Sequence, residues 1–198
     1  MYTVHGSRRS RAMRVLWTLE ELGQPHDHLP AAPRSEAVRA LNPSGKIPVL
    51  TDGDAVLTDS VAIMTYLADR HGALTHPAGT HARASQDAIT HMLIDEFDAI
   101  LWAAAKHSFV LPEDQRRPEI KESLRAEFLR SEAALEAVLA RSGGPWLMGG
   151  AFTLPDILAV HCLDWAAGAR FGPRSEALRS YAERARARPA YGRAAARG

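Results

Sequence analysis

Residues 46 to 60 of the chain read KIPVLTDGDAVLTDS, with two short apolar runs on either side of Asp-Gly-Asp. The runs, Pro48 to Thr51 and Ala55 to Thr58, predict two strands, and an Asp-Gly pair between such runs is typical of a hairpin. A helix is expected directly afterwards, from Ser60 to His71, with Gly72 as its C-terminal cap. This segment therefore predicts the order strand, strand, helix.

The preceding segment predicts a strand, a helix and a second strand. Tyr2 to His5 is a short β-like run, and apolar residues at helical spacing predict a helix that opens near Ser10 and stops at Gly23. His26 to Leu29 is expected to form the second strand. Ser35 to Leu41 is expected to form a short helix that ends at Asn42-Pro43, because the residue before a proline disfavours helical geometry. The complete order is βαβ followed by ββα.

The rest of the chain shows only helical periodicity. Residues 74 to 82 contain Pro77 and Gly79 and are expected to form a linker. Thr153 and Asp156 predict a capped helix start, and a last helix is expected to stop at Pro189. The fold class is therefore α/β plus all-α. The expected boundaries are an N-terminal domain over 1–73, a linker over 74–82 and an all-helical domain over 83–198.

Composition limits the class of protein. The chain has 198 residues, 46% hydrophobic and 24% charged, which is typical of a globular domain, and its net charge of +1 does not suggest a nucleic-acid partner. The arginine-rich segment from Arg179 to Arg197 is expected to be a solvated helix face. With Cys162 as the only cysteine and no apolar run of about 18 residues, we expect a cytoplasmic protein without disulfides or a membrane partner. No metal-ligand spacing is present.

Three motifs in this order resemble the cytosolic glutathione transferase superfamily. SRAMRVLWTLEELG (Ser10 to Gly23) resembles the S-R-x-x-R-x-L-W-x-L-E-E-L first-helix signature of its fungal and bacterial branch. NPSGKIPVL (Asn42 to Leu50) resembles the loop before the family's third strand. FTLPDI (Phe152 to Ile157) resembles its helical-domain capping motif, with Pro155 where Ala is commoner. The resemblance covers nearly the whole chain and implies a thioredoxin-like N-terminal domain, glutathione as co-substrate and a twofold homodimer.

The resemblance also implies a glutathione site at the hairpin and the helix after it. Ile47, before a cis Pro48, would offer its backbone N–H and C=O to the cysteinyl part of glutathione. Ser60 would hold the γ-glutamyl carboxylate at a helix N-terminus, and Asp59, where Glu is commoner, would assist around the amino group. Lys46 would meet the glycyl carboxylate. An edge-strand proline, an ordinary Ser N-cap and a solvated lysine are the structural alternatives.

Conjugation requires glutathione as a thiolate, so the site must hold a donor for the sulfur. Lowering a thiol pKa from about 8.5 by two units needs roughly 2.7 kcal/mol, and one hydrogen bond to a charged acceptor contributes about 1.5–3 kcal/mol. A catalytic cysteine is excluded, because the N-terminal half has none. Ser10 is the favoured donor, with Arg11 as an electrostatic helper and Ser7 as the main rival.

These residues predict a glutathione S-transferase that attacks a small hydrophobic electrophile, as in detoxification. One alternative is an enzyme that uses the same thiolate as a glutathione-dependent peroxidase or disulfide reductase. The other is a non-catalytic binding module built on the same fold, because a fold alone does not determine function.

Overall fold

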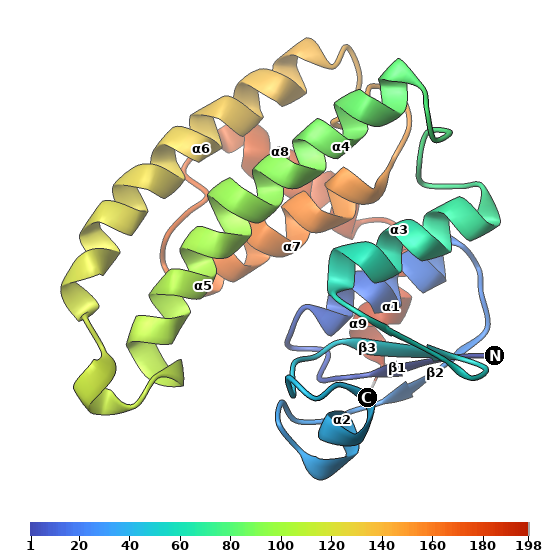
Figure 1. Ribbon diagram of the computed structural model, residues 1–198. Helices are drawn as coiled ribbons and strands as arrows, with labels where there is room; N and C mark the ends of the chain where they lie inside the picture. The colour runs from blue at the N-terminus through green and yellow to red at the C-terminus, as the bar shows by residue number, and fades with distance from the viewer. Residues whose placement is uncertain (198) are drawn as a thin grey trace. The chain divides into compact units, whose positions relative to one another are not determined.

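The computed structural model describes residues 1–197, which form two compact units (Figure 1). The first unit contains Met1–Ala78 together with the segment from Ala185 onward, and the second contains Gly79–Arg184. The chain therefore returns to the first unit at its end, which the expected division into 1–73, 74–82 and 83–198 did not include. The three ranges stay a prediction of the domain boundaries. Residue 198 lies outside the described residues.

A four-stranded mixed sheet with the order β2-β1-β3-β4 forms the centre of the first unit. Its strands are β1 (Tyr2–His5), β2 (His26–Leu29), β3 (Val49–Asp52) and β4 (Ala55–Thr58). β1 pairs in parallel with β2 and antiparallel with β3, and β3 pairs antiparallel with β4. Gly53 has a φ of 60° in the turn between the last two strands, which favours glycine. The predicted hairpin is confirmed.

Helices cover both faces of this sheet. They are α1 (Ala12–Glu21), α2 (Glu36–Leu41), α3 (Ser60–His71) and α9 (Pro189–Ala196). In Figure 1, α1 and α3 lie on one face of the sheet and α2 lies on the other. α1 contributes the fully buried side chains Val15, Leu16 and Leu19 to the core between the sheet and α3. α3 ends at Gly72, which has a φ of 63° and is the predicted C-terminal cap.

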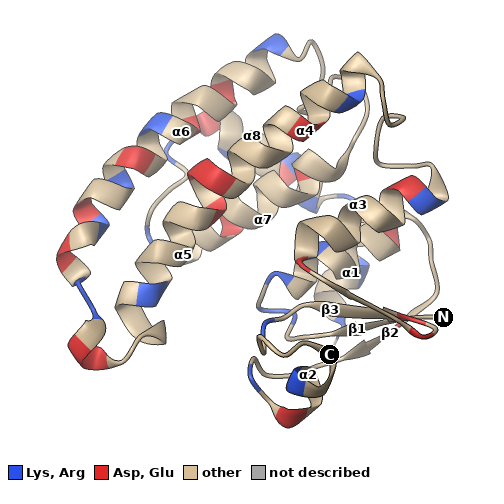
Figure 2. Cartoon of the chain, viewed as in Figure 1, with Lys and Arg blue, Asp and Glu red and all other residues tan. Residues whose placement is uncertain are grey.

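The second unit is mainly helical in its described residues, and two isolated β-bridges, Trp146 with Gly149 and Met148 with Ala151, lie between two of its helices. Its main helices are α4 (His81–Leu93), α5 (Ala99–Ala105), α6 (Lys121–Arg141), α7 (Leu154–Gly168) and α8 (Glu176–Arg186). Short π and 3-10 segments lie at Ile94–Asp98, Lys106–Val110, Glu113–Gln115 and Pro118–Ile120. Phe128 packs edge to face on Phe97 and Phe171, with ring centroids 5.2 and 6.0 Å apart. Acidic and basic residues are interspersed along α6 (Figure 2).

The predicted fold class, a thioredoxin-like βαβ–ββα domain followed by an all-helical region, is confirmed. No helix within residues 1–197 combines the length and the apolar character needed to cross a bilayer.

A buried carboxylate holds the start of α7. Asp156 accepts hydrogen bonds from the Thr153 N–H at 2.8 Å and the Thr153 hydroxyl at 3.1 Å, which confirms the predicted cap. The same carboxylate accepts from the Leu147 N–H at 2.9 Å and the Tyr181 hydroxyl at 2.7 Å. Burial raises the pKa of Asp156, and these hydrogen bonds oppose the rise.

The end of the chain differs from the expected solvated helix. α8 ends at Arg186, but Pro189 then begins a further helix, α9, instead of only stopping the previous one. Proline suits this first helical position because its missing N–H would have no helical partner there. Tyr191 of α9 packs edge to face on Trp17 of α1, with ring centroids 4.9 Å apart. The arginines of this segment therefore lie beside α1.

Three of these arginines pair with the two adjacent glutamates of α1. Arg188 donates from Nε and Nη2 to the Glu21 carboxylate, each at 2.7 Å. Arg193 donates to Glu20 Oε2 at 2.6 Å, and Arg197 donates to Glu20 Oε1 at 2.7 Å. These arginines are therefore ion-paired, which the prediction of a solvated basic face did not include, although the Arg193 side chain is still 54% exposed. Their partners lie about 170 positions earlier in the chain and leave no local pattern.

Candidate functional site

Gly6 holds the loop that follows β1 close to Ile47. Its φ is 146°, and a Cβ at this position would lie 3.1 Å from the Ala12 Cβ and 3.2 Å from the Ile47 Cβ. The Gly6 carbonyl also accepts a hydrogen bond from His28 Nε2 at 2.8 Å. Only a residue without a side chain fits this close approach. Ser7, the next residue, therefore begins a loop that is packed against the segment of Ile47.

The candidate donors Ser7, Ser10 and Arg11 all lie in this loop. The Ser10 hydroxyl donates to the Ser7 carbonyl at 2.6 Å and accepts from the Ala12 N–H at 3.1 Å. The Ser7 hydroxyl accepts from the Arg9 N–H at 3.2 Å, and within residues 1–197 no acceptor takes its proton. A hydroxyl has a single proton, so of the two serines only Ser7 has a hydroxyl proton without an acceptor in the described residues. Arg11 is half-buried directly before α1.

The Ile47–Pro48 peptide bond is cis, as the resemblance implied. Pro48 is buried and Ile47 is half-buried. The ladder between β1 and β3 begins one residue later, where Val49 pairs with His5. Neither the N–H nor the C=O of Ile47 has a hydrogen-bond partner in the described part of the chain. These two groups can therefore form backbone hydrogen bonds with a ligand that lies alongside them in a strand-like conformation.

The loop before Ile47 is held by a network around Asn42. The Asn42 side chain donates to the Lys46 carbonyl at 2.9 Å and accepts from the Ser44 N–H at 3.1 Å. Gly45, with a φ of 67°, accepts from the Arg34 N–H at 2.8 Å. The Lys46 side chain is exposed, and its ammonium group has no partner within the described residues. The lysine therefore remains available to an anion in solution.

Asp59, not Ser60, caps the N-terminus of α3. Asp59 has a φ of 69°, and its Oδ1 accepts from the N–H groups of Val61 at 2.9 Å and Ala62 at 3.0 Å. The interpretation of Ser60 as an N-cap is therefore wrong, because Ser60 is already the first helical residue and is only 2% exposed. Both capping bonds use Oδ1, so Oδ2 of Asp59 can still accept from an ammonium group.

Arg14 belongs to this site and was missed by the sequence predictions. Its side chain is fully buried, and Nη1 donates to the Ser60 hydroxyl at 3.2 Å. The sequence signal was an arginine inside the apolar face of α1, next to Val15 and Leu16. A buried arginine in such a position needs polar partners. The partner, 46 residues later, could not be read from spacing.

Two polar residues of β1 lie outside the site. The Tyr2 hydroxyl shares a 2.9 Å hydrogen bond with His71 Nε2 at the end of α3, and burial is the largest cause of its raised pKa. His5 Nε2 lies 3.3 Å from Thr51 Oγ1, and burial lowers the pKa of this histidine. Tyr2 is at the far end of its strand from Ser7, as expected, and His5 has a structural role.

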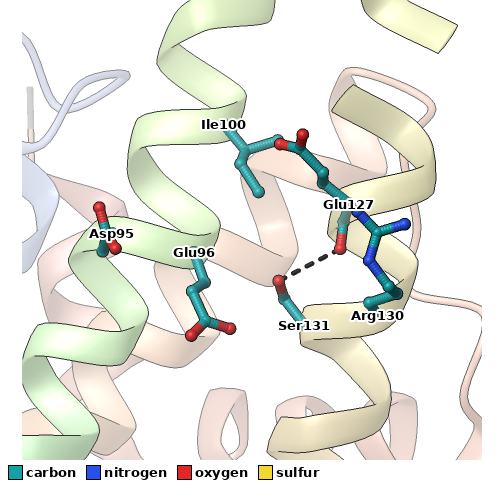
Figure 3. A pocket seen from close by; sticks show the side chains of 6 residues that line it. All are labelled: Asp95, Glu96, Ile100, Glu127, Arg130 and Ser131. Atoms are coloured by element: carbon teal, nitrogen blue, oxygen red, sulfur yellow. Dashed lines mark hydrogen bonds between the residues drawn. The ribbon is translucent and has the colours of Figure 1, made fainter. Parts of the chain in front are cut away.

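The second unit contains a separate hollow of about 430 Å³ beside α6 (Figure 3). Its lining is mainly charged and comprises Asp95, Glu96, Ile100, Glu127, Arg130 and Ser131. Three of these side chains are carboxylates, so the hollow does not suit a hydrophobic electrophile. None of the candidate glutathione residues lines it. Across residues 1–197, no group of three or more His, Cys, Asp and Glu side chains could hold a metal ion.

Two protein-family models match this chain. The N-terminal domain of glutathione S-transferase matches residues 2–77, and its C-terminal domain matches residues 97–189. The chain is 27% identical to a putative glutathione S-transferase alpha-2 of Dictyostelium discoideum, over 77% of this chain and 66% of that protein. It is 30% identical to glutathione S-transferase 1 of Manduca sexta, over 81% of this chain and 73% of that protein.

Solved structures extend the similarity to the full fold. The theta class glutathione S-transferase of Xanthomonas axonopodis pv. citri, solved with glutathione bound, is 28% identical with a TM-score of 0.80. That comparison covers 100% of this chain and 98% of the other. By contrast, the chain spans only about half to two thirds of the length of some curated relatives that it matches.

Proposed function

Since the chain belongs to the glutathione transferase superfamily, we propose that it binds glutathione in its first unit and activates the thiol for attack on a small hydrophobic electrophile. The observation that carries this proposal is that three places in the first unit have hydrogen-bonding groups without a partner in the described residues. They are the backbone groups of Ile47, the N-terminus of α3 at Asp59 and Ser60, and the hydroxyl of Ser7.

Each part of glutathione has a complementary group in this set. The γ-glutamyl carboxylate accepts from the Ser60 hydroxyl at the positive end of α3, and the neighbouring ammonium pairs with Oδ2 of Asp59. The cysteinyl backbone hydrogen-bonds with the N–H and C=O of Ile47, next to Pro48. The exposed Lys46 pairs with the glycyl carboxylate. A relative solved with glutathione bound supports the choice of ligand.

Ser7 is the donor that this geometry favours for the thiolate. Its hydroxyl is the one in the loop whose proton has no acceptor in the described residues, and Gly6 brings it beside the Ile47 segment. Ser10 supports the loop through its bond to the Ser7 carbonyl, and Arg11 adds positive charge. The thiol proton passes to solvent and the Ser7 hydroxyl donates to the sulfur anion. The sulfur then bonds to the electrophilic carbon, which releases its leaving group.

Two alternative functions remain: one is a different reaction of the same bound thiolate, and the other is binding of glutathione without a reaction. Attack on a peroxide or a mixed disulfide would make the protein a glutathione-dependent peroxidase or disulfide reductase. A binding module would take up glutathione without turnover. Steady-state assays of the purified protein with glutathione and a nitroaryl halide, a hydroperoxide or a mixed disulfide separate them. We expect the nitroaryl halide to give the highest kcat/KM, and no turnover with any of the three would contradict an enzymatic role.

The setting of this activity follows from the same proposal. A conjugation of hydrophobic electrophiles serves detoxification, and the proposed protein acts in the cytoplasm as a homodimer, without nucleic-acid or membrane partners. The single cysteine, Cys162, is buried and forms no disulfide, as suits a reducing compartment.

A further inference from the structure

Arg14 and Ser60 meet between α1 and α3, and none of the proposed glutathione contacts uses the arginine. Both residues are buried, Arg14 with 0% and Ser60 with 2% of its surface exposed. The bond between Arg14 Nη1 and Ser60 Oγ measures 3.2 Å. A charged side chain that is fully buried requires polar contacts to offset its desolvation. The position therefore calls for a reason beyond packing.

The chemistry of the pair determines where the Ser60 proton goes. A guanidinium group only donates, so the Ser60 oxygen must accept in this bond. The hydroxyl proton is then left over, and no acceptor within residues 1–197 takes it. The N–H of Ser60 likewise has no acceptor there, whereas the next two N–H groups bind Asp59. Ser60 thus offers two donors to a ligand at the start of α3.

The charge of Arg14 also matters at this helix end. Asp59 places a carboxylate at the same N-terminus, and a like charge disfavours a second carboxylate nearby. The positive end of α3 offsets this only in part. A buried guanidinium directly behind Ser60 interacts more strongly than an exposed one, because the surrounding dielectric constant is lower. Its contact with Ser60 therefore places positive charge next to the hydroxyl that would meet an anionic ligand.

We propose that Arg14 is a positioning residue for the γ-glutamyl carboxylate of glutathione: it holds the Ser60 oxygen as an acceptor, directs the hydroxyl proton toward the ligand and supplies the positive charge that offsets Asp59. Arg14 itself does not touch the ligand in this arrangement. The inference rests on the proposed function, and it names the residue that makes Ser60 selective for a carboxylate.

Titration calorimetry with two ligands tests this role. One ligand is glutathione, and the other is 4-aminobutyryl-cysteinylglycine, which lacks only the γ-glutamyl carboxylate. Arg14→Gln is expected to raise the Kd for glutathione by about tenfold or more, as for a lost bond to a charged group, and to change the Kd for the analogue less than about threefold. Arg39→Gln, an exposed arginine of α2, is the matched control and is expected to change neither.

A double variant tests whether Arg14 acts through Ser60. If it does, Arg14→Gln combined with Ser60→Ala loses less affinity for glutathione than the product of the two single losses. Equal losses for both ligands, or fully multiplicative losses in the double variant, would overturn the proposal and leave Arg14 as a packing residue. If circular dichroism shows that Arg14→Gln does not fold, Arg14→Lys replaces it. A smaller loss of affinity for glutathione than was expected for Arg14→Gln, with little loss for the analogue, supports the role. An equal loss of affinity for both ligands refutes it.

The outcome also distinguishes this inference from the function on which it rests. A parent protein that binds no glutathione contradicts the proposed function. A parent that binds glutathione while Arg14→Gln binds both ligands as the parent does contradicts only the role of Arg14.

Discussion

Two serine hydroxyls three residues apart have different hydrogen-bonding roles in the loop after β1. Ser10 uses its proton on the Ser7 carbonyl and its oxygen on the Ala12 N–H, so it joins the loop to the first turn of α1. Ser7 uses only its oxygen, on the Arg9 N–H. A ligand can take the Ser7 proton without breaking a bond, whereas it must displace an existing bond to take that of Ser10. The cost of such a displacement is about 1 kcal/mol.

The first prediction separates these two roles. Ser7→Ala is expected to lower the conjugation rate at pH 7 by roughly eightfold and to raise the Kd for glutathione only about fourfold, because the bound thiolate loses about 2 kcal/mol of stabilisation. Ser10→Ala is expected to lower the free energy of unfolding by about 1 kcal/mol instead. The measurements are pH–rate profiles and urea unfolding of both variants. A shifted pH–rate midpoint in Ser10→Ala alone would make Ser10 the donor.

Among the elements, α1 connects the candidate site to the end of the chain. The loop of Ser7 leads into its first turn, Arg14 lies in its middle, and Glu20 and Glu21 lie in its last turn. The glutamates hold α9 through Arg188, Arg193 and Arg197. Trp17 adds a bond from its indole N–H to Glu21 at 2.9 Å. We therefore expect the ion pairs between α1 and α9 to stabilise the helix that follows the loop of the candidate donors.

The second prediction concerns these ion pairs. The side chain of Glu21 is 7% exposed and that of Arg188 is 31% exposed, so removing the arginine leaves a nearly buried carboxylate without its bidentate partner. Arg188→Ala is expected to lower the free energy of unfolding by about 1–3 kcal/mol. Arg141→Ala, at the exposed end of α6, is the control and is expected to change it by about 0.5 kcal/mol or less. Equal effects in urea unfolding would show that the pair is not stabilising.

The third prediction is a dependence of stability on pH at Glu20. Burial alone would raise the pKa of Glu20, but hydrogen bonds from Arg193 and Arg197 lower it below the ordinary value of 4.5. Because the folded pKa lies below the unfolded one, the pairs contribute fully above about pH 4.5, and the contribution is lost as pH falls through the folded pKa. Between about pH 5 and 3 the parent should therefore lose stability more steeply than Glu20→Gln. Parallel curves would contradict this.

At the scale of the whole molecule, the sequence predicted those features that depend on neighbouring residues. The strand of Tyr2–His5, the hairpin around Gly53 and the capped start of α7 at Thr153 all occur where expected. Each follows from alternation, helical periodicity or turn chemistry within about ten residues. The cis peptide bond before Pro48 was also expected from a local motif, and the roles of Ile47, Asp59 and Ser60 in binding stay predictions.

The features that were missed depend on contacts between distant residues. The bond from Arg14 to Ser60 spans 46 positions, and the bond from Arg188 to Glu21 spans 167. The cap of α3 was assigned to Ser60 instead of Asp59, because a φ of 69° at an aspartate is not visible in the sequence. The choice between Ser10 and Ser7 as the donor stays a prediction, because a motif shows which residue types are present but not where their protons point.

The fourth prediction concerns assembly. The resemblance implies a twofold dimer in which the thioredoxin-like domain of one subunit packs on the helical domain of the other. Light scattering at micromolar concentration is expected to give about twice the chain mass of 21.6 kDa. A mass equal to one chain would contradict the dimer but not the proposed glutathione site, because all its candidate residues belong to the first unit.

The central claim is that this chain binds glutathione and holds it as a thiolate near neutral pH. The direct measurement is a pH titration of the thiolate ultraviolet absorbance of glutathione bound to the parent and to Ser7→Ala. A free thiol has a pKa of about 8.5, and we predict a midpoint about two units lower in the parent. The midpoint in Ser7→Ala should lie about 1.5 units above that of the parent. A parent midpoint near 8.5, or no bound glutathione at all, would contradict the account.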